Sequence, residues 1–171
     1  MESNKFNIAV LPLQGKLFRF ALSIIKNDAN AKDALQEVLI KLWELRERLN
    51  KYNSIEAFAM RMMKNHCIDR LRKNKHTIDI SDDVMGAYNL TPEKLATLKD
   101  ESNLAFRIIE QLPYTQQMII RLKDVEEYDF DEIADIMEMA AGAVRTNLSR
   151  ARQAVREQML KTVSFGAQIK T

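Results

Sequence analysis

The sequence predicts an all-α protein of two helical modules joined by an acidic linker. Turn residues are scarce, with 4 Gly and 3 Pro in 171 residues. Apolar side chains recur at helical spacing over long stretches, and good helix formers, including 9 Met, are abundant. Because β architectures need many turn residues, this composition favours helices. We expect the modules at residues 1–76 and 101–171, with the linker at 77–100.

The first module is expected to hold three helices, at residues 9–27, 31–49 and 55–73. Asn27 and Asp28 should end the first helix, Asn30 should cap the second, and Ser54 should cap the third. The expected core stripe of the second helix follows the helical period, and its members are Leu35, Val38, Leu39, Leu42, Leu45 and Leu49.

The second module is expected to hold four helices, at residues 101–111, 114–123, about 131–137 and 141–161. Asp129 or Asp131 should cap the third of them. The linker at 77–100 loses the helical pattern, apart from one short helix near its end. Many helix-turn-helix turns place Gly where Glu138 or Met139 stands, so Glu138 must adopt the required backbone at some cost.

Charge is distributed unevenly along the chain, although the net charge is only +2. Residues 1–76 carry 15 basic and 8 acidic side chains, and residues 77–103 carry 2 and 6. Residues 104–171 carry 9 and 10. A basic module, an acidic connector and a nearly neutral module therefore follow one another.

Several classes of function are disfavoured. Cys67 is the single cysteine, which excludes an intramolecular disulfide and indicates a reduced, cytoplasmic protein. We expect no signal peptide, no membrane insertion and no metal or other cofactor. His66 and His76 lie in or beside a basic run, His66–Cys67 has no evident orienting group, and there is no Gly-rich phosphate loop. The chain is therefore not expected to be an enzyme.

The last two expected helices have the dimensions of a helix-turn-helix, which favours binding to double-stranded DNA. In the long helix, Val144, Leu148, Ala151, Val155 and Met159 form one apolar stripe. Side chains able to bond phosphates or base edges lie beside it, among them Arg145, Thr146, Asn147, Ser149, Arg150, Arg152 and Arg156. The alternative is an ordinary solvated amphipathic helix.

A second basic segment, residues 61–75, holds six bases and one acid. Tyr52 and Phe58 lie just upstream, and basic groups with nearby aromatic rings suit unstacked, single-stranded bases. The alternative is a basic helix end that complements the helix dipole.

The helix at 31–49 has an unusual outer face. Ile40 lies almost opposite the core stripe, with Trp43 on the flank and carboxylates around both. This pattern indicates a protein interface, unless another helix of the same module covers the two side chains.

Three linked motifs resemble bacterial extracytoplasmic-function (ECF) sigma factors. They are AKDALQEVLIKLW (31–43), AFAMRMMKNHCIDRLRKNK (57–75) and the stretch at 108–157 that contains EIADIMEMAAGAVRTNLSRARQAVRE. The likeness covers most of residues 10–160 in the family's order. It implies that the first module is sigma region 2, a helical bundle, and the second is sigma region 4, a helix-turn-helix.

The resemblance implies a role for each face. Residues that would dock on core RNA polymerase are Asp33, Gln36, Glu37, Ile40, Lys41 and Trp43. Residues that would hold the melted −10 strand are Lys51, Tyr52, Asn53, Ser54, Phe58, Arg61, Lys64, Asn65, Arg70 and Arg72. Residues that would read the −35 duplex are Arg145, Thr146, Asn147, Ser149 and Arg150. Phe58 stands where the family often has Trp, and Asn147 stands where many members have a base.

The implied function is a sigma factor that binds core polymerase, recognises a promoter and opens it without catalysing a reaction. An anti-sigma factor is a possible further partner, because free members of the family are commonly held by one. The alternative is a two-module helix-turn-helix regulator that does not associate with polymerase.

Overall fold

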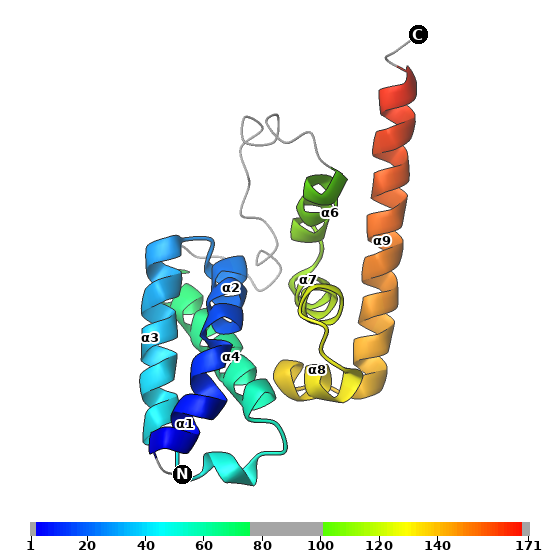
Figure 1. The fold of residues 1–171 in the computed structure, drawn as a ribbon. Coiled ribbons are helices and arrows are strands. Elements are labelled where there is room, and N and C mark those ends of the chain that lie inside the picture. The colour runs from blue at the N-terminus through cyan, green and yellow to red at the C-terminus, as the bar shows by residue number, and fades with distance from the viewer. Residues whose placement is uncertain (1–2, 76–100, 169–171) are drawn as a thin grey trace. The chain divides into compact units, whose positions relative to one another are not determined.

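The computed structural model describes residues 3–75 and 101–168, and these ranges contain helices but no strand (Figure 1). The all-α prediction is confirmed. The described helices pack as two compact units. One contains α1 to α4 together with α8, and the other contains α6, α7, the segment η4 and α9. The linker predicted at 77–100, with its short helix, lies outside the described residues.

The N-terminal stretch is broken near Pro12, contrary to the single helix expected at 9–27. Helix α1 (Ser3–Val10) is followed by a 3-10 turn, η1 (Leu11–Leu13), and then by α2 (Gln14–Ile25). Proline lacks an N–H group and its ring clashes with the carbonyl four residues earlier, which explains the break. Helix α2 ends at Ile25, and its C-cap Lys26 adopts a left-handed backbone with φ 59°.

Helix α3 spans Asp28–Glu44, and its N-cap is Asn27 rather than the expected Asn30. The Asn27 side chain accepts a hydrogen bond of 2.9 Å from the Asn30 backbone N–H. Asn27 is extended and directly follows left-handed Lys26, so it already occupies the capping position. The helix also ends earlier than expected, and residues 49–51 form a separate 3-10 turn, η2 (Leu49–Lys51).

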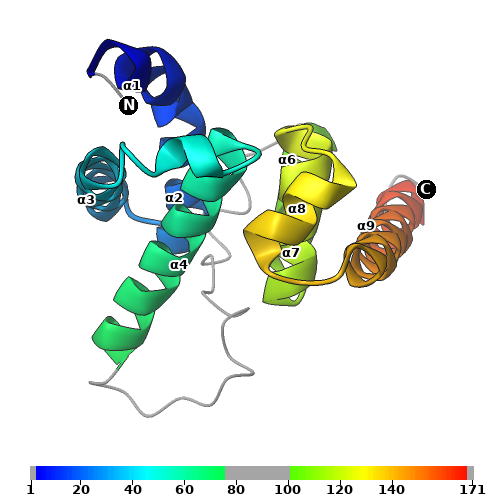
Figure 2. The same cartoon turned by 90° about the horizontal axis from the view of Figure 1, so that it is seen from below.

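Helix α4 (Ile55–Lys75) begins after Ser54, whose hydroxyl accepts a 3.1 Å hydrogen bond from the Ala57 N–H. The predicted cap is confirmed. Helix α4 crosses α3 rather than running parallel to it, and Figure 2 shows α3 nearly end-on. The core between α2, α3 and α4 includes Leu17, Phe20, Val38, Leu42, Met60 and Met63, all buried.

The stretch Phe6–Ile25 is apolar enough by length and composition to cross a membrane, with a mean hydropathy of 1.5. The sequence predicts no membrane insertion, and one such helix is weak evidence against that prediction, because the core helix of a soluble protein can be equally long and apolar. In the structure the stretch is broken at η1. Its side chains Val10, Leu17 and Phe20 are buried in the core of the unit, whereas Ile8 is 70% exposed.

The second unit contains α6 (Glu101–Glu110), α7 (Tyr114–Ile120) and α9 (Ala141–Gln168), and α9 lies alongside the other two (Figure 1). Val144, Leu148 and Ala151 of the predicted stripe are buried, whereas Val155 and Met159 are half-buried. The structure differs after Ile120, where a π-helical segment, η4 (Arg121–Val125), replaces the expected end of an ordinary helix. Its wide turn is closed by the Glu126 N–H donating to the Arg121 carbonyl over 3.0 Å.

Between η4 and α9 in the chain comes α8 (Phe130–Met137). Glu138 follows it with a left-handed φ of 57°, so a side-chain-bearing residue stands where the conformation favours glycine. The prediction that Glu138 adopts the backbone usually assigned to glycine in this turn is confirmed. Helix α9 is longer than predicted, because it continues past Lys161 to Gln168.

Candidate polymerase and nucleic-acid interfaces

The outer face of α3 carries the six residues predicted to bind a protein partner. Ile40 is 58% exposed, although it is a large apolar side chain. Trp43 is 38% exposed and is partly covered by α1, because the Phe6 ring meets it edge-on with centroids 5.0 Å apart. The remaining members of this face are exposed and polar: Asp33, Gln36, Glu37 and Lys41.

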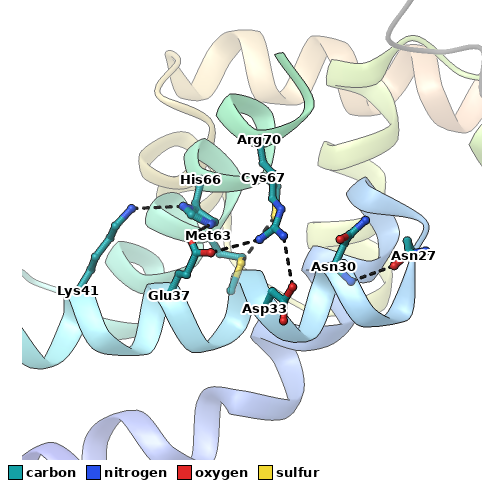
Figure 3. Close-up of polar contacts among 9 residues, drawn as sticks. All are labelled: Asn27, Asn30, Asp33, Glu37, Lys41, Met63, His66, Cys67 and Arg70. Atoms are coloured by element: carbon teal, nitrogen blue, oxygen red, sulfur yellow. Dashed lines mark hydrogen bonds and ion pairs between the residues drawn. The ribbon is translucent and has the colours of Figure 1, made fainter. Parts of the chain in front are cut away.

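Arg70 of α4 lies over the carboxylates of that face, as Figure 3 shows. Its guanidinium is 3.4 Å from Asp33 Oδ2 and 3.4 Å from Glu37 Oε1. The resemblance had assigned Arg70 to the DNA strand and the two carboxylates to the polymerase. These predicted sites therefore share an ion-pair network across α3 and α4.

His66 lies in the same network, below Arg70 on α4 (Figure 3). Its Nδ1 is 3.3 Å from Lys41 Nζ, and its Nε2 is 3.1 Å from Glu37 Oε2 without a well-aligned hydrogen bond. An ammonium can only donate, so Nδ1 accepts and the ring proton sits on Nε2, towards the carboxylate. Burial and the nearby Lys41 charge lower the pKa of His66 from its usual 6.5.

Cys67 follows His66 on α4, but it points into the core. Its thiol lies 3.7 Å from the Met63 sulfur, and burial raises its pKa to about 12. The thiol therefore stays protonated and unreactive near neutral pH.

The loop before α4 and the first turns of that helix form a stack of aromatic and cationic groups. Tyr52 is 39% exposed, and its ring lies on Phe58 with centroids 3.8 Å apart. The Arg61 guanidinium sits 5.5 Å from the Phe58 ring centroid. The predicted loop residues Lys51, Asn53 and Ser54 line one hollow together with these three side chains.

Lys64 and Asn65 hold a carboxylate in this structure. Lys64 Nζ is 3.0 Å and Asn65 Nδ2 is 3.2 Å from Glu138 Oε2. The hydrogen bonds from Lys64 and then Asn65 lower the pKa of Glu138. Both donors are therefore occupied by this carboxylate, and Lys64 is buried, with 5% of its surface exposed. Arg72, the last predicted member of this site, is exposed on α4.

A polar hollow of about 260 Å³ opens between α3 and α4 beside these groups. Asn65 and Arg61 lie on its α4 wall, and Lys41 lies on its α3 wall. His66 also lines it, so the network of Figure 3 forms part of its surface. The hollow therefore connects the predicted partner-binding face with the predicted strand-binding face.

The five predicted −35 residues all lie in the first three turns of α9. Arg145, Thr146, Ser149 and Arg150 are exposed, and Asn147 is half-buried. The Thr146 hydroxyl donates to the Gly142 carbonyl and the Asn147 amide to the Ala143 carbonyl, at 3.0 and 2.9 Å. These bonds leave the hydroxyl oxygen and the amide oxygen as acceptors at the surface. The helix can therefore present both donors and acceptors to a duplex.

Sequence reasoning missed two residues beside this surface, Lys123 and Phe130. Lys123 Nζ lies 5.0 Å and Arg145 Cζ 4.9 Å from the Phe130 ring centroid. Nothing in the spacing of these residues indicated the contact, because it depends on the π-helical segment. His66 was also missed as a link within its network, although its position in the basic run was noted.

Comparisons with known proteins identify the family of the chain. Residues 10–77 match the family model for Sigma-70 region 2, and residues 103–155 match that for Sigma-70 region 4. The RNA polymerase sigma factor SigV of Bacillus subtilis is 31% identical over 84% of this chain and 84% of its own length. The ECF RNA polymerase sigma factor SigW of the same organism is 26% identical over 84% and 83%.

A solved structure of the sigma factor RpoE from Bartonella quintana, in complex with the anti-sigma factor NepR, has the same fold. Its TM-score is 0.70 at 22% identity, covering 92% of this chain and 97% of that one. The chain belongs to the RNA polymerase sigma factors, which are non-enzymatic factors for promoter recognition. Within them it is a member of the ECF group.

Proposed function

We propose that this sigma factor docks on core RNA polymerase through the outer face of α3, recognises a promoter at two elements, and separates the strands at the −10 element. The protein acts in the cytoplasm, where polymerase and promoter are found. The observation that carries the proposal is Ile40, an apolar side chain 58% exposed beside the carboxylates of Asp33 and Glu37.

The chemistry of the α3 face supports a polymerase contact. A protein interface typically places an apolar anchor at its centre and charged groups at its rim. Ile40 has the exposure of such an anchor, and Trp43 adds an aromatic surface already held by Phe6. The rim carboxylates are oriented by Arg70 before any partner arrives, which lowers the ordering cost of binding.

The stack of Tyr52, Phe58 and Arg61 supports capture of a melted strand. An unstacked base gains free energy by lying on an aromatic ring, and nearby cations hold the backbone. Phe58 covers one face of the Tyr52 ring, and the ring is 39% exposed. A base can therefore stack on the other face of Tyr52. Asn65, on the wall of the adjacent hollow, can bond the edge of a base that enters it.

The exposed groups of α9 support readout of the −35 duplex. Arginine forms two hydrogen bonds with guanine in the major groove, and Asn or Ser can bond to other base edges. Arg150 and Ser149 are exposed on the same stretch of helix as Arg145. A reader tethered to polymerase does not need high affinity on its own, because the tether raises its effective concentration.

An anti-sigma factor is the second partner that we propose. The structurally similar RpoE is bound to the anti-sigma factor NepR in its solved complex. The α3 face would suit such a partner for the same physical reasons that suit polymerase, so the two would compete. A partner of this kind would hold the sigma factor inactive until released.

Transcription with purified components tests the proposal. The chain is mixed with core polymerase and fragmented genomic DNA, and transcripts are mapped by their 5′ ends. We expect discrete start sites preceded by a shared pair of elements, and co-migration of the chain with core polymerase. A chain that binds duplex DNA but neither joins the polymerase nor directs transcripts would instead support the polymerase-independent regulator.

A further inference from the structure

The Phe130 ring brings two cations together beside the surface that we propose to read the −35 element. Lys123 from η4 and Arg145 from α9 both approach this ring, at 5.0 and 4.9 Å from its centroid. The two positive groups are therefore within about 10 Å of each other, roughly one screening length at physiological salt. Two cations on one ring make the local potential positive, which favours an anion beside them.

Protein carboxylates do not supply that anion in the described part of the chain. Lys123 is the one basic residue in the segment 122–144, which contains eight acids. Nevertheless the Lys123 ammonium donates to the Tyr128 carbonyl over 2.9 Å and faces the Phe130 ring. No carboxylate among the described residues lies within ion-pairing distance of this ammonium. The neighbouring Asp124 is held instead by Arg152, whose Nε is 3.1 Å from Asp124 Oδ2.

The segment around Lys123 is fixed by contacts on each side. The Asp124–Arg152 pair joins the end of η4 to α9, and the π-helical turn is closed by the Glu126–Arg121 bond. Tyr128, whose carbonyl receives the Lys123 ammonium, is buried. Lys123 is thus held at a defined place next to Arg145, and less side-chain entropy is lost when it binds a ligand.

We propose that Lys123 contacts a backbone phosphate of the duplex at the edge of the −35 element, and that Phe130 is a positioning residue that aligns Arg145 for the bases. The inference rests on the proposed function and adds two residues to it. Phosphate contacts fix the register of a reading helix, and base contacts then supply specificity. A cation that lies on an aromatic ring and still meets water keeps its positive charge. It can therefore also bind a phosphate.

Salt-dependent binding of reconstituted holoenzyme to promoter duplexes tests the role of Lys123. Lys123→Gln should weaken binding roughly three- to tenfold on every sequence and reduce the slope of log K against log salt by about 1. Lys123→Arg should keep the wild-type slope. The matched control is Lys32→Gln, which removes the same charge from a lysine already paired with Asp28 at 2.6 Å, and it should change neither quantity.

The role of Phe130 is tested on the same duplexes with single base changes in the −35 element. Phe130→Leu should reduce discrimination at one position about two- to fivefold, and Phe130→Tyr should restore it, because the tyrosine ring also attracts cations. Circular dichroism and thermal unfolding of each variant separate this effect from a loss of fold. A merely structural Phe130 would change stability but not the preference for one base.

The outcomes separate this inference from the proposed function. If wild-type holoenzyme binds and transcribes but Lys123→Gln keeps the full salt slope, the phosphate contact is wrong and the proposed function stands. If discrimination is unchanged in a folded Phe130→Leu variant, the positioning role is wrong. If wild-type protein gives neither holoenzyme nor promoter binding, it is the proposed function that fails.

Discussion

The rings of Tyr52 and Phe58 stack nearly in parallel, with centroids 3.8 Å apart and planes 19° from each other. Phe58 lies on α4 and is half-buried, whereas Tyr52 comes from the loop before it and is 39% exposed. The stack therefore has one inner ring, which is fixed by the helix, and one outer ring, which has a free face. This arrangement assigns the two aromatic side chains different tasks in holding a melted strand.

For Tyr52→Ala, we expect weaker capture of the single-stranded −10 element by holoenzyme. Base–aromatic stacking contributes about 1–3 kcal/mol per base, so the affinity should fall by roughly 5- to 150-fold. The Tyr52→Phe variant should retain most of the affinity for the −10 element, because the ring face is preserved. Fluorescence anisotropy with a labelled −10 oligonucleotide measures the effect. Equal affinity of the Ala and Phe variants would show that no base stacks on Tyr52.

For Ile40→Asp, we expect loss of binding to core polymerase with the fold intact. The side chain is 58% exposed, so a carboxylate there stays hydrated in the free protein but must be desolvated at an interface. Removing a central anchor costs about 2 kcal/mol or more, which is roughly 30-fold in affinity. Competition for core against a labelled wild-type chain gives the change directly.

The matched control for Ile40 is Ile8→Asp. Ile8 is 70% exposed on α1, and it lies two residues from Phe6, so it points away from the contact with Trp43. This variant should bind core as the wild type does. Unfolding of Ile40→Asp in the free protein would mean that Ile40 belongs to the core after all.

The exposure of Ile40 could be predicted because it depends only on the helical period. It lies opposite the apolar stripe of its own helix, and no partner needs to be known. The left-handed backbone at Glu138 could be predicted for a similar reason, since the turn demands it from whichever residue is there. The break at Pro12 was predictable in principle from the missing N–H group, but the apolar period continued through it and concealed the boundary.

The shared ion-pair networks could not be predicted. Arg70 and Asp33 are 37 residues apart and meet only because α4 crosses α3. Similarly, Lys123 reaches Phe130 only because a π-helical turn widens residues 121–125. Periodicity identifies which side of a helix faces outward, but it gives no information on which outward groups of two helices meet. These tertiary contacts decide which predicted site residues share a partner.

For His66→Gln, we expect a change in the pH dependence of stability. The folded-state pKa of His66 is below its usual value of 6.5, mainly because of burial. His66 therefore binds a proton more readily in the unfolded chain than in the folded one. The stability that neutral His66 contributes to the fold is complete above about pH 6.5 and falls as pH drops through the folded-state pKa. Glu37 and Asp69 raise that pKa, whereas Lys41 and Arg70 lower it.

Chemical denaturation at several pH values between about 5 and 8 measures this effect as the difference between wild type and His66→Gln. Carboxylates titrate in both proteins and cancel in the difference. The wild type should lose more stability than the variant on acidification. Parallel curves for the two proteins would mean that His66 has the same pKa in the folded and unfolded chain.

Arg150 and Arg152 are two residues apart on α9, and we expect opposite consequences from their removal. Arg150 is exposed, so Arg150→Ala should cost about 1–3 kcal/mol at one position of the −35 element and relax specificity there. The Arg152 guanidinium makes two hydrogen bonds to Asp124, so Arg152→Ala should lower the thermal stability slightly and leave base preference unchanged. Binding to a panel of −35 duplexes, each with one altered base pair, distinguishes them. Equal weakening on every duplex by Arg150→Ala would show that this side chain touches only phosphate.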